Sequence, residues 1–224
     1  MAARVEECAV SPRPFAATLA RIDWTLFHTI NTSVATRDWL EDPLTALGAG
    51  VVPLFAFATV GLWFLARPYG DARWKMACMS GLVSAAVALL ANQVVSHVWE
   101  RPRPYVAHPA LTHLLSAPSP DPSFPSDHAA AAFAIAVAVF AFSRRVGALF
   151  LATAALIGAS RVAMGMHYPS DVLAGMLVGC AAAALVTHAG RPWIARLVTL
   201  LSRFSDPPLR RVWDKLGRRT LARS

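Results

Sequence analysis

The stretch Phe124-Pro-Ser-Asp-His-Ala-Ala-Ala-Ala-Phe-Ala-Ile-Ala-Val-Ala-Val-Phe-Ala-Phe142 decides the fold of this protein. Its beginning is typical of a helix start, with Ser126 or Asp127 as the cap. From Ala129 onward every residue is apolar, as in a helix buried in a bundle or a membrane. The apolar run is short for a membrane span, although the Pro125-Ser126 start could add a turn.

Four further apolar runs flank this stretch, each long enough or nearly long enough to cross about 30 Å of hydrocarbon. They are Leu44–Ala66, Met76–Trp99, Gly147–Met166 and Val172–Ala189. Of the 224 residues, 56% are hydrophobic and only 15% are charged, whereas ordinary globular domains carry about 25% charged residues. The sequence therefore predicts an all-α fold, a polytopic membrane bundle of five transmembrane helices.

Two segments outside these runs are predicted to lie at the membrane surface. Residues 15–37 mix apolar and polar groups, which indicates an amphipathic interfacial helix. The alternative, a sixth spanning helix, would bury Arg21 and Asp23. After Arg191, apolar residues recur at helical spacing among arginines, although Arg210–Arg219 could instead be a disordered tail. We thus divide the chain into an N-terminal amphipathic segment (1–43), a transmembrane core (44–190) and a basic cytoplasmic interfacial tail (191–224).

The formal charge of +8 could suggest a nucleic-acid partner, but the cations gather at the borders of the apolar runs. This placement is typical of a membrane protein with basic loops. Most arginines and lysines fall between the first and second runs, between the third and fourth, and after the fifth. The positive-inside rule makes that side cytoplasmic. We therefore predict a multi-pass plasma-membrane protein without a nucleic-acid partner. The other end of the bundle, which carries few cations, is predicted to face away from the cytoplasm.

Three polar stretches, all predicted at that other end, concentrate groups that bind or attack phosphate. They are Trp99–Pro104, Phe124–His128 and Ser160–Asp171. Together they supply three arginines, two histidines, three serines and three carboxylates. Because basic groups are scarce within an apolar chain, their concentration predicts one shared anion site.

The third stretch holds the candidate nucleophile, His167. Asp171 lies four residues later, where its carboxylate could fix the imidazole tautomer and leave the other ring nitrogen free to attack. Pro169 places His167 in a connection, with Ser170 predicted as the cap of the next helix. Arg161 could bind two phosphate oxygens at once. The alternative is a simple salt bridge between Arg161 and Asp171, with His167 at the membrane surface.

The other two stretches supply further candidate groups. Backbone N–H groups after Ser126 form an anion site at a helix start, where His128 could donate a proton to a leaving oxygen. Alternatively, Ser126 is an ordinary cap and His128 is a solvated histidine. Arg101 and Arg103 are held by prolines and present two guanidinium groups; alternatively they extend to lipid headgroups. Gly175 and Gly179 permit close helix approach, within the bundle or between subunits.

Together the three stretches resemble the type-2 phosphatidic acid phosphatase superfamily, which shares its phosphate site with vanadium haloperoxidases. Arg103-Pro104 matches the end of the first family motif, and Pro125, Ser126 and His128 match the second. The third motif is matched without a gap, by Ser160, Arg161, His167 and Asp171. Stretches 103–108, 125–128 and 165–175 further resemble the bacitracin-resistance type of undecaprenyl-diphosphate phosphatase.

The resemblance implies hydrolysis of undecaprenyl diphosphate through a phosphohistidine, with no cofactor and no metal. His167 would be the nucleophile, Asp171 its stabilising carboxylate and His128 the acid. The implied partners are a polyprenyl diphosphate lipid and the bilayer, and the implied role is lipid-carrier recycling for cell-wall synthesis, with bacitracin resistance. One alternative is a phosphatase of phosphatidylglycerol phosphate or phosphatidic acid. Another is a non-catalytic lipid-phosphate binder or flippase.

Two positions depart from the superfamily pattern. Ser96 stands where the family has a lysine, and either His97 or Arg101 could compensate. Asp127 replaces the glycine before the catalytic histidine and could hold an arginine or orient a water. The expected phosphate-binding residues are Arg103, Arg161, Ser126, Arg101 and Asp127.

Overall fold

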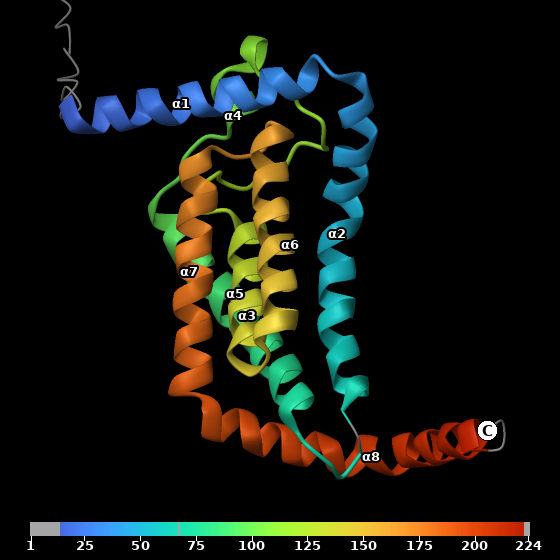
Figure 1. Ribbon diagram of the computed structural model, residues 1–224. Coiled ribbons are helices and arrows are strands. Elements are labelled where there is room, and N and C mark those ends of the chain that lie inside the picture. The colour runs from blue at the N-terminus through green and yellow to red at the C-terminus, as the bar shows by residue number, and fades with distance from the viewer. Residues whose placement is uncertain (1–13, 67, 222–224) are drawn as a thin grey trace, which may run out of the picture.

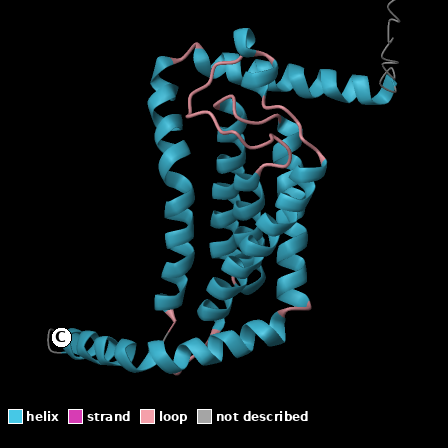
Figure 2. Ribbon diagram, turned by 180° about the vertical axis from the view of Figure 1, so that it is seen from behind, coloured by secondary structure: helices cyan, strands magenta, loops and turns pink. Residues whose placement is uncertain are grey.

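The computed structural model describes residues 14–66 and 68–221, and this part of the chain is all helix and loop (Figure 2). Its elements in chain order are α1 (Pro14–Ala35), α2 (Asp38–Leu65), α3 (Arg73–Val98), α4 (Pro104–Ala107), the 3₁₀ helix η1 (Pro109–Leu111), α5 (Asp127–Phe142), α6 (Arg144–Ala163), α7 (Pro169–His188) and α8 (Arg191–Leu221). The predicted all-α class is confirmed.

Helix α5 is the centre of the bundle. It packs against α3, α6 and α7, while α2 packs outside against α3 and α6 (Figure 1). Alternate small residues make this position possible, because alanine lets neighbouring backbones approach closely. The buried alanines of α5 are Ala129, Ala130, Ala132, Ala134, Ala136 and Ala138. Larger core residues, including Phe55, Ile135 and Ile157, fill the space beside them.

Each of the five predicted apolar runs falls in one bundle helix. Helices α3, α6 and α7 are long and apolar enough to cross a membrane, while Pro53–Leu65 within α2 and the whole of α5 are shorter apolar segments. The expectation that Pro125 and Ser126 add a turn is wrong, because α5 begins at Asp127. Its 16 residues span about 24 Å, and it starts below the upper ends of α6 and α7 (Figure 1). The polar groups at its start are therefore recessed within the bundle.

Helix α1 lies across the end of the bundle at which α5 begins (Figure 1). This orientation favours the interfacial interpretation over a sixth spanning helix. A buried stripe of Asp23, Phe27 and Asn31 faces the protein, while Leu19, Ile22, Leu26 and Ile30 are exposed. Arg21 is exposed and Asp23 is buried, so only one of the two charges is enclosed. Residues 1–13 of the predicted N-terminal segment lie outside the described residues.

Helix α8 lies across the opposite end of the bundle (Figures 1 and 2). Ile194 and Val198 are buried against the bundle, and exposed apolar residues such as Phe204 occupy other faces. A buried ion pair between Lys75 of α3 and Asp206 fixes the helix in place. The helix continues to Leu221, so the segment from Arg210 to Arg219 is helical rather than disordered. Residues 222–224 of the predicted tail lie outside the described residues.

Candidate active site

A cavity of about 300 Å³ lies at the recessed start of α5. All three polar stretches contribute to its wall, so the predicted shared site is assembled in the fold. The lining residues that the sequence predicted are Arg103, Asp127, His128, Arg161 and His167. Gln93, Ser96 and His97 of α3 join them, together with Glu100 and the loop residues Ser119 and Asp121.

His167 lies in the connection between α6 and α7, as the position of Pro169 predicted. Gly165 makes the turn into this connection with φ of 79°, a left-handed conformation that favours glycine. A side chain there would also meet the carbonyl oxygen of His113, 2.6 Å from the added Cβ. Glycine at this position thus lets the loop carry His167 into the cavity wall.

The two ring nitrogens of His167 have different partners. Nδ1 lies 2.8 Å from the carbonyl oxygen of Ser123, which can only accept, so Nδ1 carries the proton. Nε2 lies 3.2 Å from Nη1 of Arg103, which can only donate, so Nε2 keeps its lone pair. The ring is therefore a neutral imidazole whose unprotonated nitrogen faces a guanidinium group. This is the arrangement of a nucleophile beside an anion-binding group.

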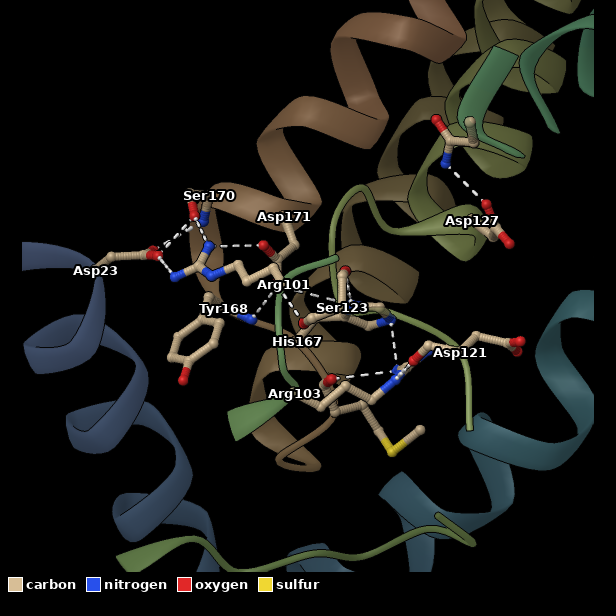
Figure 3. A network of polar contacts seen from close by, with 12 residues as sticks. Asp23, Arg101, Arg103, Asp121, Ser123, Asp127, His167, Tyr168, Ser170 and Asp171 are labelled. Carbon is tan, nitrogen blue, oxygen red and sulfur yellow. Dashed lines mark hydrogen bonds and ion pairs between the residues drawn. The ribbon is translucent and has the colours of Figure 1, made fainter. Parts of the chain in front are cut away.

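Asp171 stabilises this ring less directly than the spacing suggested. Its Oδ2 is 3.8 Å from Nδ1 of His167, too far for a hydrogen bond. Instead Oδ2 accepts from the hydroxyl of Ser123 at 2.5 Å and from the backbone N–H of Tyr168 at 2.9 Å (Figure 3). Asp171 thus holds Ser123, and the carbonyl of Ser123 holds His167. Ser123 was not a predicted site residue, and its place before Phe124-Pro125 gives no signal of this role.

Two buried arginines face the cavity. Arg103 is 8% exposed and donates from Nε to the carbonyl of Asp121 at 2.8 Å, which orients its guanidinium beside His167. Arg161, at the end of α6, is 3% exposed. Guanidinium groups bind phosphate oxygens in fixed directions, and two of them on one cavity wall are suited to a phosphate-like anion.

The start of α5 contributes a further anion-binding feature. Ser126 occupies the N-cap position but makes no side-chain cap bond. Its hydroxyl is buried without a hydrogen-bond partner among the described residues. A buried unsatisfied hydroxyl at the N-terminus of a helix is suited to an oxyanion. His128, half-buried in the first turn of this helix, lines the cavity, whereas the predicted phosphate ligand Ser126 is not among the residues of the cavity wall.

The two positions that depart from the superfamily pattern have specific surroundings. Asp127 accepts a hydrogen bond from the side-chain amide of Asn92 at 2.8 Å, so an amide of α3 is its partner rather than an arginine. Ser96 lines the cavity and donates to the carbonyl of Gln93. Of the two residues that could compensate for the missing lysine, His97 lines the cavity.

Arg101 does not line this cavity. Its Nη1 donates to Ser170 Oγ and to Asp171 Oδ1, both at 2.7 Å, and its Nη2 donates to Asp23 Oδ2 at 2.7 Å (Figure 3). The guanidinium also stacks 3.9 Å from the ring of Tyr168. Burial raises the pKa of the Tyr168 phenol above its ordinary value, so this ring stays neutral beside the cation. The structure separates Arg101 from the other predicted phosphate ligands because protein acceptors surround it.

The start of α7 also differs from the prediction. The helix begins at Pro169 with Tyr168 at the N-cap, so Ser170 is inside the helix rather than its cap. The hydroxyl and the backbone N–H of Ser170 both donate to Asp23 of α1, at 2.6 and 2.9 Å. Asp171 lies in the first turn, as predicted. The sequence marks Asp23 only as a charge that a spanning helix would have to bury, and it gives no signal of the link between Asp23 and the site.

Several known proteins are similar to this chain in sequence or in fold. The chain is 27% identical over 200 residues to the putative undecaprenyl-diphosphatase YbjG of Escherichia coli, covering 87% of this chain and 98% of that protein. It is 27% identical over 157 residues to the undecaprenyl-diphosphatase BcrC of Bacillus subtilis, covering 70% and 78% of the two chains. The crystal structure of a PAP2-type phosphatidylglycerolphosphate phosphatase from B. subtilis superposes with a TM-score of 0.55 at 25% identity, covering 79% of this chain and 90% of that one.

The family assignment follows from the match of residues 77–194 to the model of the PAP2 superfamily. That range runs from α3 into the first turn of α8 and contains every predicted catalytic and phosphate-binding residue. The all-helical bundle and its apolar helices agree with the match. This chain belongs to the PAP2 superfamily, a family of membrane lipid phosphatases.

Proposed function

We propose that this protein hydrolyses undecaprenyl diphosphate to undecaprenyl phosphate and inorganic phosphate, using His167 as the nucleophile. The observation that carries the proposal is the orientation of His167, whose unprotonated Nε2 is 3.2 Å from Arg103 in a cavity that Arg161 and His128 also line. A site that only binds lipid phosphate needs cations but no oriented nucleophile. The names of the relatives YbjG and BcrC support the choice of a diphosphate lipid.

The proposed reaction has two steps. Nε2 of His167 attacks the terminal phosphorus, and the bond from that phosphorus to the bridging oxygen breaks, releasing undecaprenyl phosphate. Water then attacks the phosphohistidine, and its phosphorus–nitrogen bond breaks to release inorganic phosphate and restore the ring. Arg103, Arg161 and the N-terminus of α5 stabilise the equatorial oxygens.

The remaining groups support these two steps. The Ser123 carbonyl accepts from Nδ1–H of His167 and so stabilises the positive charge that develops on the ring. His128 donates a proton to the leaving oxygen and then accepts one from the attacking water. In this scheme the protein supplies the nucleophile and the acid–base group, and no metal ion is required.

The test is phosphate release by the purified protein in detergent micelles containing undecaprenyl diphosphate, with and without a chelator. We expect turnover that the chelator leaves unchanged, and none from His167→Ala. His113→Ala is a matched control, because His113 is an exposed histidine outside the cavity wall. Substantial turnover by purified His167→Ala would refute the nucleophile assignment.

The same assay separates the substrate classes. We expect undecaprenyl diphosphate to be turned over with a higher kcat/KM than phosphatidylglycerol phosphate or phosphatidic acid. A preference for either of those lipids would assign the site to another lipid phosphate. Saturable binding of all three without phosphate release would indicate a binder or flippase instead.

We further propose that the site opens on the extracytoplasmic face of the plasma membrane. The support is charge asymmetry: α8 and the first turns of α3 and α6 carry most of the cations at the end opposite the site. The test uses single cysteines in a protein whose native cysteines have been replaced. A cysteine at Ala117 marks the site end of the bundle, and one at Arg145 marks the opposite end. An impermeant thiol reagent added to intact cells should label only the position at 117, and labelling only at 145 would reverse the topology.

A further inference from the structure

A chain of short charged hydrogen bonds joins the surface helix α1 to the candidate active site. Asp23 of α1 accepts from Arg101 at 2.7 Å, and Arg101 donates at the same distance to Asp171 of α7. The side chain of Asp171 is fully buried, and those of Asp23 and Arg101 are 10% and 24% exposed. Figure 3 shows Arg101 reaching from one carboxylate to the other. The three groups form one enclosed ionic cluster that spans separate elements.

Arg101 is required in this cluster for electrostatic reasons. It provides the cation that compensates the buried carboxylate of Asp171, and it separates that carboxylate from Asp23. Hydrogen bonds between ionised groups are shorter and about twice as strong as neutral ones, and a guanidinium group can make several in fixed directions. Without Arg101, two carboxylates would remain close together away from water. The cluster therefore determines where the Asp171 carboxylate lies.

The position of Asp171 is passed on to the proposed nucleophile. Its second oxygen accepts from the hydroxyl of Ser123, and the carbonyl of Ser123 accepts from Nδ1 of His167. A shift of Asp171 therefore moves Ser123, and with it the acceptor that fixes the tautomer and tilt of the imidazole ring. A misplacement of about 1 Å at the reacting atoms is enough to slow a reaction by about 100-fold.

Helix α1 is itself anchored against the site end of the bundle. The amide of Asn31 donates to the carbonyls of His113 and Ala163, each at 2.8 Å, and Phe27 packs on Val162 and Tyr168. Asp23 is thus presented from a fixed helix rather than from a mobile side chain at the surface. Its bonds to both Ser170 and Arg101 connect α1 with the beginning of α7.

We infer that Asp23 and Arg101 are positioning residues for phosphoryl transfer: acting from α1, they hold Asp171 and Ser123 so that Nε2 of His167 is aligned with the bound phosphate. The inference rests on the proposed role of His167 as nucleophile. It assigns to Arg101 a function different from phosphate binding, the role expected from its place in the Arg101-Pro102-Arg103 motif. It also makes α1 part of the catalytic unit.

The test compares Arg101→Ala and Asp23→Ala with Arg103→Ala in steady-state assays. A positioning residue affects kcat, whereas a phosphate ligand also affects KM and competitive inhibition by inorganic phosphate. We expect kcat to fall about 100-fold for Arg101→Ala and about tenfold for Asp23→Ala, because in the latter Arg101 keeps Asp171. For both, KM and the phosphate inhibition constant should stay within about twofold of wild type, while Arg103→Ala should raise both constants.

Arg21→Ala is the matched control, since Arg21 is an exposed cation on the same helix, and it should behave as wild type. Arg101→Lys keeps the charge between the two carboxylates and should recover part of the lost kcat. Thermal unfolding of each variant separates misfolding from a loss of alignment. Should Arg101→Ala fail to fold, Arg101→Lys and Asp23→Asn provide the same comparison.

The double variant Asp23→Ala/Arg101→Ala gives the decisive result. If Asp23 acts through Arg101, replacing Asp23 in the Arg101→Ala protein should lower kcat little further, because Asp23 has already lost its partner. The inference would be overturned if the kcat losses of the two single variants multiply in the double variant. It would also be overturned if Arg101→Ala raises the phosphate inhibition constant as much as Arg103→Ala does. An active His167→Ala would instead refute the proposed function. Inactive His167→Ala together with normal kcat in Asp23→Ala and Arg101→Ala would refute only the positioning role.

Discussion

The approach of α7 to α5 provides the sharpest test of the site geometry. A Cβ added at Gly175 of α7 would lie 2.4 Å from the carbonyl oxygen of Ser126 and 3.2 Å from the backbone nitrogen of Ala130. At Gly179, one turn further along, the added Cβ would lie 2.3 Å from the carbonyl oxygen of Ala130. Both glycines therefore serve close helix approach within the bundle, one of the two roles that the sequence left open.

The displacement caused by Gly175→Ala follows from these distances. A carbon and a carbonyl oxygen come into contact at about 3.3–3.6 Å, so the two backbones must separate by roughly 1 Å. The start of α5, with Ser126 at its N-cap and His128 in its first turn, would move away from the His167 loop by about that amount. A misplacement of about 1 Å can slow catalysis by about 100-fold. Overpacking a helix contact destabilises a protein by about 1–3 kcal/mol.

We therefore expect Gly175→Ala to lower kcat by about 100-fold and to lower the thermal unfolding midpoint measured in detergent. Gly179→Ala should reduce stability to a similar extent with a smaller loss of kcat, because it meets α5 one turn away from the site. Gly61→Ala is the control, since nothing lies within 4 Å of its added Cβ. Wild-type kcat and midpoint in Gly175→Ala, or equal damage in Gly61→Ala, would refute the reasoning.

Three further perturbations test other parts of the structure. His128→Ala should slow cleavage of undecaprenyl diphosphate less than that of phosphatidic acid, because a leaving phosphate needs less protonation than a leaving alkoxide; equal losses in parallel assays would contradict the acid role. Lys75→Ala should reduce the free energy of unfolding, measured in denaturant titrations, by about 3–5 kcal/mol, because Asp206 is left buried without its cation. The double variant Lys75→Met/Asp206→Leu replaces both charges by apolar groups and should recover most of that loss. Ser123→Ala keeps the carbonyl that holds His167 but loses the hydroxyl bond to Asp171. We therefore expect kcat to fall about tenfold, equivalent to about 1.4 kcal/mol. An unchanged kcat would show that Ser123 does not transmit the position of Asp171 to His167.

The sequence predicted the parts of this protein that depend on local pattern. Each apolar run became a bundle helix, because uninterrupted apolar composition requires burial in protein or lipid. His167 was placed correctly in a connection because Pro169 disfavours a helical conformation in the residue before it. The shared cavity followed from three polar stretches that end apolar runs on the same side.

The contacts within the site could not be predicted in the same way, because they depend on how separate elements meet. The i,i+4 spacing brings Asp171 near His167, but the loop before α5 places the Ser123 carbonyl closer to the ring. Asp23 and Ser170 are 147 residues apart in sequence. Helical spacing relates residues within one element only, so neither the Ser123 relay nor the partners of Arg101 has a local signature.

The different roles of the arginines bear on what the site can recognise. Arg101 is held by two carboxylates, so Arg103 and Arg161 are the two predicted phosphate-binding arginines that face the cavity. A phosphoryl group carries about 1.5–2 negative charges, which two guanidinium groups are sufficient to balance. Cavity-lining carboxylates, among them Glu100 and Asp127, make a second closely bound phosphate less favourable. On the proposed function, Arg103 and Arg161 therefore bind the terminal phosphoryl group, and the inner phosphate departs with the lipid once His128 has protonated the leaving oxygen.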